Sequence, residues 1–115
     1  MASALLTFIL WVTTFFLAST PAAAVVPSNA TGPYMDGLDA LNEGRWRDAA
    51  GALTRALEVA GDNPDIVLAR GVASTLGEDF PNALKDLQRV GRLGYPGQGP
   101  EVWLYVAEAM SGTVT

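Results

Sequence analysis

The chain has 115 residues with no Cys and no His, and seven basic residues against twelve acidic ones give a net charge of −5. The missing residue types exclude disulfides, thiol nucleophiles, the usual zinc ligands and the commonest general base. The acidic balance speaks against a nucleic-acid ligand and against an electrostatic hold on anionic lipid, since both need a basic surface. The length is sufficient for one small domain.

The first predicted element is an apolar segment without any charge. Residues 5–18, LLTFILWVTTFFLA, form an unbroken run of apolar residues and Thr, and Ala22 and Ala24 are placed like a signal-peptidase site. We therefore expect residues 1–24 to be a cleaved signal peptide of a secreted or periplasmic protein. An uncleaved membrane anchor is the alternative, because no Lys or Arg precedes the run. A buried core helix is a further alternative.

Residues 25–32, VVPSNATG, follow this segment and contain several turn-forming residues. This composition predicts an extended linker before the folded part of the chain.

A first helical repeat is expected over residues 33–63. Apolar and small residues recur at helical spacing over residues 33–43 and 46–60, which predicts two helices. Gly44 separates them and can take a positive φ at the end of the first helix, and so short a break makes the two helices antiparallel neighbours. The small and apolar positions that define the second helix are Trp46, Ala49, Leu53 and Ala56.

A second repeat, residues 64–97, follows the same plan. Like residues recur thirty-four positions apart, in the pairs Gly37 and Gly71, Trp46 and Phe80, Ala49 and Ala83, and Leu53 and Leu87. Four matches at one period predict a repeat architecture. Asp79 is placed to cap the second helix of this unit, and Pro81 is tolerated in its first turn.

A third unit, residues 98–115, is either a partial repeat or a capping helix. Residues 101–110, EVWLYVAEAM, are similar to a first helix, with Ala107 matched to Gly71 at a spacing of thirty-six. Glu101 and Glu108 are the only charges of this segment. We expect one side of it to pack on the second repeat and its other apolar side chains to need a cover, for which self-association is one possibility.

This pattern resembles the tetratricopeptide repeat family. The residues that carry the resemblance are those of the four pairs above together with Gly44, Ala56, Arg70, Ala73 and the Asn63-Pro64 turn. The resemblance implies an all-α fold, a short α-solenoid of antiparallel helical hairpins whose first helices line a concave side. Three positions depart from the family pattern: Gly61, Gly77 and Val90.

The resemblance also implies a binding groove on the concave side. The residues expected to face it are apolar, and they are Tyr34, Leu38, Leu41, Leu68, Val72, Leu76 and Leu104. Family members that clamp a peptide carboxylate use Lys, Arg and Asn at such positions, so a clamp is not expected here. The apolar stripe suits an amphipathic helix or an extended apolar segment. Alternatively, these residues are ordinary core or are covered by the chain's own N-terminal segment.

No pattern in the sequence predicts catalysis, a metal site or a cofactor. Asp36, Asp39 and Glu43 share one helix face, but no other ligand type is near them in sequence, so a solvated surface is expected. The Ser and Thr residues have no His to activate them. We therefore expect an exported protein–protein interaction scaffold that is not an enzyme and whose partner is another polypeptide. A truncated paralogue of a larger exported or membrane-anchored repeat protein is the alternative.

Overall fold

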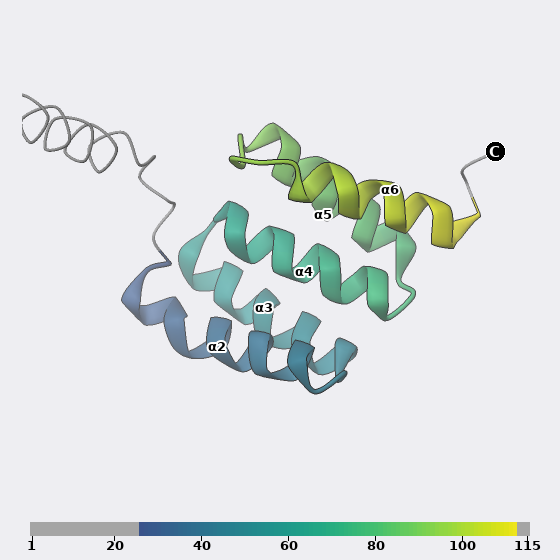
Figure 1. Ribbon diagram of the computed structural model, residues 1–115. Coiled ribbons are helices and arrows are strands. Elements are labelled where there is room, and N and C mark those ends of the chain that lie inside the picture. Colours follow the sequence, from purple (N-terminus) through teal and green to yellow (C-terminus); the bar gives the residue numbers. More distant parts are fainter. Residues whose placement is uncertain (1–25, 113–115) are drawn as a thin grey trace, which may run out of the picture.

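The computed structural model describes residues 26–112, so the expected signal peptide lies outside the described residues. Within residues 26–112 there are five helices and no strand (Figure 1). The helices are α2 (Ser28–Asn42), α3 (Trp46–Ala60), α4 (Pro64–Leu76), α5 (Phe80–Arg92) and α6 (Gly99–Ser111). The all-α expectation is confirmed, and the bounds expected for α3 are those observed.

The helices are stacked in chain order, with α2 and α3 at one end and α6 at the other (Figure 1). Each helix packs against its neighbours along the chain. In addition α2 contacts α4, and α4 contacts α6, whereas α3 and α5 do not contact each other. The first helices of the hairpins therefore lie closer together than the second helices do.

The extended linker expected over residues 25–32 is wrong for most of its length, because α2 begins at Ser28. Ala30 is fully buried, and Val26 packs against the core of the first hairpin. The Thr31 hydroxyl donates a hydrogen bond of 3.2 Å to the carbonyl oxygen of Pro27. The composition of this segment reflects only the weak helix propensity of its Ser, Asn, Thr and Gly residues. Burial of apolar surface outweighs that propensity here.

The core consists of two clusters of buried side chains in which Ala predominates. The first joins α2, α3 and α4 and contains Ala40, Ala49, Leu53, Ala56, Ile66 and Ala73. The second joins α5 and α6 and contains Ala83, Leu87 and Ala107. The Ala residues let the helix backbones approach closely, and each buried Leu contributes roughly 1.5–3 kcal/mol of hydrophobic stabilisation.

The helix termini are capped unequally. The side-chain oxygen of Asn63 accepts hydrogen bonds from the backbone N–H groups of Asp65 and Ile66, at 3.0 and 3.3 Å, and so caps α4. Asp79 precedes α5 but makes no such bond, so the cap expected from the sequence is wrong. Its carboxylate instead accepts a hydrogen bond of 2.7 Å from the Asn82 side chain.

Candidate functional site

Each of the first two hairpins contains the same close contact, between a Gly of its first helix and a Leu of its second helix. A Cβ atom built on Gly37 would lie 2.6 Å from Cγ of Leu53, and one built on Gly71 would lie 2.9 Å from Cδ2 of Leu87. Real Cβ atoms do not approach other atoms so closely, so each position admits only Gly while its Leu keeps this place. The thirty-four-residue period of the sequence is therefore also a period of the packing.

The remaining structural positions expected from the sequence lie at the same hairpin interfaces. Ala49, Ala56 and Ala83 are fully buried. Trp46 and Phe80, which open α3 and α5, are partly buried. The Trp46 side chain lies over the turn after α4, where its Cβ atom would be 3.2 Å from a Cβ built on Gly77.

The turns that follow α2, α4 and α6 show how the third unit aligns with the first two. Gly44, Glu78 and Gly112 have φ values of +76°, +63° and +77°, and they are thirty-four residues apart. Ala73 and Ala107 are also thirty-four apart, and both are buried in a core cluster. The third unit therefore keeps the period of thirty-four, and the spacing of thirty-six expected from the sequence is wrong.

The residue that corresponds to Gly71 in this register is Tyr105 and not Ala107. Both Gly71 and Ala107 are small, but Gly71 lies against Leu87 of its own hairpin, whereas Ala107 packs against the preceding helix. The sequence alone does not distinguish two small residues that face opposite sides of a helix.

The seven expected groove residues are all partly buried. Tyr34 and Leu41 pack against the first core cluster, and Leu68 and Leu104 pack against the second. Leu38, Val72 and Leu76 belong to neither cluster. Four of the seven expected groove residues therefore pack partly against the core.

Leu104 is not a groove position in the observed register. It corresponds to Arg70 of α4, and it packs on the second core cluster beside Leu84. The α6 residues that correspond to the pair Tyr34 and Leu38 of α2 and to the pair Leu68 and Val72 of α4 are Val102, which is exposed, and Val106, which is partly buried. The apolar stripe consists of one pair from each first helix, and its members are Tyr34, Leu38, Leu68, Val72, Val102 and Val106.

Tyr34 lies at one end of the stripe, close to Asp65 of α4 and Tyr95 of the loop before α6. Burial raises the pKa of the Tyr34 hydroxyl above its ordinary value, and the charges of Asp65 and Tyr95 raise the pKa further. The hydroxyl is therefore a neutral hydrogen-bond donor at neutral pH.

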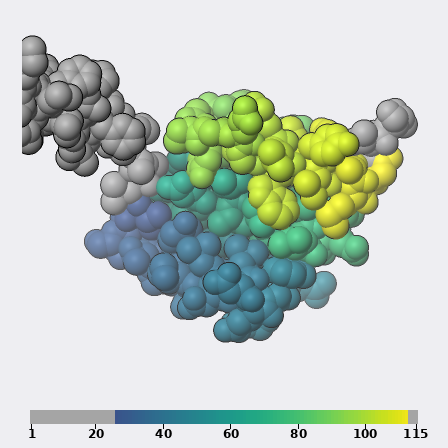
Figure 2. Space-filling view, viewed as in Figure 1, coloured from purple at the N-terminus to yellow at the C-terminus, as the bar shows by residue number. Residues whose placement is uncertain are grey.

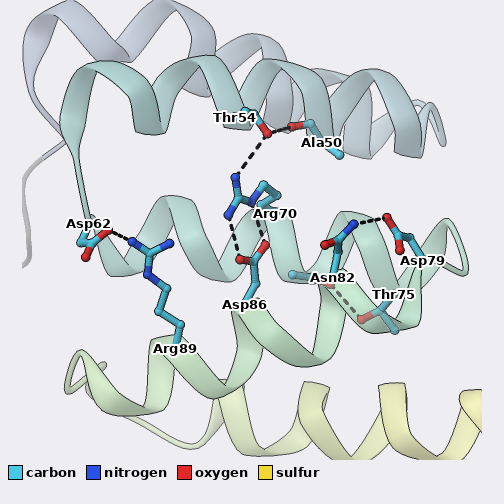
Figure 3. Close-up of polar contacts among 10 residues, drawn as sticks. Ala50, Thr54, Asp62, Arg70, Thr75, Asp79, Asn82, Asp86 and Arg89 are labelled. Carbon is cyan, nitrogen blue, oxygen red and sulfur yellow. Dashed lines mark hydrogen bonds and ion pairs between the residues drawn. The ribbon is translucent and has the colours of Figure 1, made fainter.

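A polar network that sequence reasoning missed lies between three helices (Figure 3). Arg70 of α4 donates two hydrogen bonds to the carboxylate of Asp86 on α5, from Nε at 2.7 Å and from Nη2 at 2.8 Å. Its Nη1 atom donates to the hydroxyl oxygen of Thr54 on α3 at 3.3 Å. Thr54 in turn donates to the carbonyl oxygen of Ala50. The network is structural, since it fixes α4 between its two neighbours.

The spacing of the two residues in the sequence could have indicated this ion pair. Arg70 and Asp86 are sixteen residues apart, as are Gly71 and Leu87. Residues at this spacing face each other across the hairpin. A second ion pair joins Arg89 of α5 and Asp62 of the turn before α4, and it is more exposed to solvent (Figure 3).

The carboxylates of Asp36, Asp39 and Glu43, in α2 and directly after it, lie at an open surface. Asp36, Asp39 and Glu43 line a depression of about 510 Å³ together with Arg47 and Arg55 of α3. Among residues 26–112, no group of three or more carboxylates is placed to hold a metal ion. The solvated helix face expected from the sequence agrees with this geometry.

In the part of the chain that the structure describes, none of the helices has both the length and the apolar character that a membrane span requires. Comparisons of the chain with protein-family models, with curated proteins and with solved structures gave no match.

Proposed function

We propose that this protein is an exported scaffold of the tetratricopeptide type that binds a segment of another polypeptide along the apolar stripe. The observation that carries the proposal is that each first helix supplies a pair of partly exposed apolar side chains at one period of thirty-four residues. The first helices are in contact and the second helices are not, which supports an arrangement with these pairs on the inner side of the stack.

The chemistry of the stripe defines the kind of ligand. Leu38, Val72 and Val106 are apolar, partly buried and spaced thirty-four residues apart. Such a surface suits the apolar face of an amphipathic helix or alternate side chains of an extended segment. Tyr34 and Asp65 at one end can accept or donate hydrogen bonds and would fix the direction of the ligand.

The test uses a photo-crosslinking amino acid placed in the full chain inside its own cell. At Val72, in the middle of the stripe, we expect a crosslinked adduct with a second polypeptide. At Gln88, which is exposed on α5, we expect none. Adducts of equal yield at both positions, or no adduct at Val72, would contradict a ligand in the stripe.

Export is proposed from the uncharged apolar run and the Ala22–Ala24 pair of the sequence. The intact mass of the chain recovered from the cell envelope tests it. We expect the mature chain to begin directly after Ala24. A chain that retains residues 1–24 would indicate a membrane anchor instead.

A further inference from the structure

A polar depression lies where the start of α3 meets the turn after α4, and we call it the Trp46 depression. Both segments lie at the same end of the helices (Figure 1), and Figure 2 shows in the same view that the side chains of the first hairpin lie directly against those of α4. The depression has a volume of about 360 Å³, which is at the lower end of the range of sites for small ligands. Its size suits one long side chain or a small molecule.

The apolar part of the lining comes from α3 and α4. Trp46 supplies an aromatic group, and Ala50 and Ala73 supply methyl groups. The Trp46 side chain begins beside Gly77 and extends towards Gly44, since its Cβ and Cζ2 atoms would lie 3.2 Å and 3.8 Å from Cβ atoms built on these two glycines. The indole therefore lies between the turn after α2 and the turn after α4.

Ser74 of α4 also lines the Trp46 depression. It is only 5% exposed, and within residues 26–112 its hydroxyl group forms no hydrogen bond. The neighbouring Thr75 hydroxyl, by contrast, donates to the carbonyl oxygen of Gly71 at 2.8 Å. No fully buried side-chain polar atom of the described residues lacks a partner, so the Ser74 oxygen is accessible from the depression. A hydroxyl that no protein group satisfies in such a place is available to a ligand.

Two carboxylates, those of Glu78 and Asp79, also line the depression. Glu78 forms no ion pair within residues 26–112, and one oxygen of Asp79 accepts the hydrogen bond from Asn82. Glu78 has a φ of +63°, at a position where Gly stands in the turns after α2 and α6. Strained residues of this kind are frequent at binding sites, where the side chain is needed despite the strain. The turn thus presents a carboxylate where Gly would be more stable.

Among the described lining residues, Arg47 is the one base. It also lines the larger depression between α2 and α3, together with the carboxylates of Asp36 and Asp39. Those carboxylates attract its guanidinium to their side. Two carboxylates against one shared guanidinium leave the Trp46 depression negative, which favours a cationic ligand and disfavours an anionic one.

The chemistry of this lining defines the class of ligand. An ammonium group donates three hydrogen bonds, and Glu78, Asp79 and the Ser74 oxygen are acceptors for them. The indole of Trp46 attracts a cation through its π electrons. The methylene groups behind the ammonium of a lysine side chain suit the methyl groups of the two alanines.

We propose that the Trp46 depression binds a primary ammonium group, carried by a lysine side chain of a partner polypeptide. The proposal does not depend on the apolar stripe, since the described lining of the depression and the stripe have no residue in common. The stack then has two binding surfaces, of which the stripe selects apolar side chains and the depression selects a positive charge.

The experiment follows the indole N–H signal of Trp46 by NMR, in the full chain in a non-ionic detergent. The probes are the peptide acetyl-Gly-Lys-Gly-amide, the same peptide with norleucine or Glu in place of Lys, and n-butylammonium, which has no peptide backbone. We expect the Lys peptide to shift the Trp46 signal saturably and to bind roughly tenfold or more tightly than the norleucine and Glu peptides. It should also bind more tightly than n-butylammonium. The signal of Trp103, which lies on α6, should stay unchanged.

Four substitutions in the chain make the test specific. Glu78→Gln keeps the size of the side chain and should weaken binding of the Lys peptide roughly fivefold or more. Ser74→Ala removes the hydroxyl and should weaken it roughly threefold or more. Arg47→Gln removes the like charge and should strengthen it. Asp62→Ala is the matched control, because it removes a carboxylate at the turn before α4, and it should leave binding unchanged.

Several outcomes would overturn the proposal. One is an equal response of the Trp46 signal to the Lys and norleucine peptides, or no response to either. Another is an equal loss of binding in Glu78→Gln and Asp62→Ala, since the attraction would then come from the net charge of the chain and not from the depression. Binding of n-butylammonium as tight as that of the Lys peptide would assign the site to small amines and exclude the polypeptide as its specific ligand. The thermal midpoint of each variant, measured in parallel, shows that a loss of binding is not a loss of folding.

Discussion

At the scale of single residues, Glu78 has a backbone conformation that disfavours any side chain. Its φ of +63° lies in the left-handed region, where Gly44 and Gly112 stand at the equivalent turns. The Gly of this turn is Gly77, one residue earlier, and its φ of −85° does not need Gly. The turn after α4 is therefore strained by about 1 kcal/mol relative to the other two.

We predict that Glu78→Gly stabilises the protein by about 0.5–1 kcal/mol, because Gly has no steric penalty at positive φ. The midpoint of thermal unfolding should rise by roughly 2–6 °C for a domain of this size. Gly77→Ala is the matched control and should destabilise, since its Cβ would lie 3.2 Å from both the Ala73 carbonyl oxygen and Trp46 Cβ. An unchanged or lower midpoint for Glu78→Gly would contradict this account of the turn.

A second prediction concerns the contact of Gly37 with Leu53. Gly37→Ala should lower the free energy of unfolding by about 1–3 kcal/mol, since Leu53 must leave its place in the core. Gly32→Ala should be neutral or stabilising, because a Cβ there meets no atom within 4 Å. Chemical denaturation measures both values. In a double-mutant cycle, Leu53→Ala should remove most of the cost of Gly37→Ala, and additive effects would refute the contact.

At the scale of helices, the Arg70–Asp86 pair determines how firmly α4 is held against α5. The side chains are 23% and 4% exposed, so removal of one partner leaves a poorly hydrated charge. We predict that Asp86→Ala costs about 3 kcal/mol of unfolding free energy. The combined change Arg70→Met and Asp86→Leu should recover a large part of the loss, because the apolar pair needs no desolvation.

The Asp62–Arg89 pair is the control for this prediction. Its side chains are 56% and 33% exposed, so solvent screens the interaction. Asp62→Ala should change the unfolding free energy by less than about 1 kcal/mol. Equal effects of Asp62→Ala and Asp86→Ala in denaturant titrations would show that burial does not distinguish the two pairs.

At the scale of the whole molecule, the described helices differ in how extensively their neighbours hold them. Helix α4 is held between α3 and α5, whereas α6 contacts only α5 and α4 within residues 26–112. Stability in such a stack is the sum of the interfaces between neighbouring helices, and α6 has the least extensive interfaces of the described helices, so it should open first.

We therefore predict that α6 opens without unfolding of the other helices. Native-state hydrogen exchange should give amide protection in α6 roughly tenfold to a hundredfold lower than in α4. Equal protection in α4 and α6 would mean that the helices unfold as one unit.

The sequence determined the hairpins of the first two repeats. Gly44 acts through local physics, since its positive φ is favoured by the residue type itself, and Leu53 and Leu87 belong to helical periods that can be read within a few residues. The period of thirty-four then follows from the repetition of those local signals.

Tertiary structure alone decided the features that depend on what lies beside a helix. Burial of Ala30 and Val26 made residues 28–32 helical despite their turn-like composition. In α6, Ala107 is the residue that packs against α5. Tyr105 therefore stands at the position equivalent to Gly71, and Leu104 packs against the core. Composition and spacing specify which residues are small or apolar, but the neighbouring helix decides which face of each helix is buried.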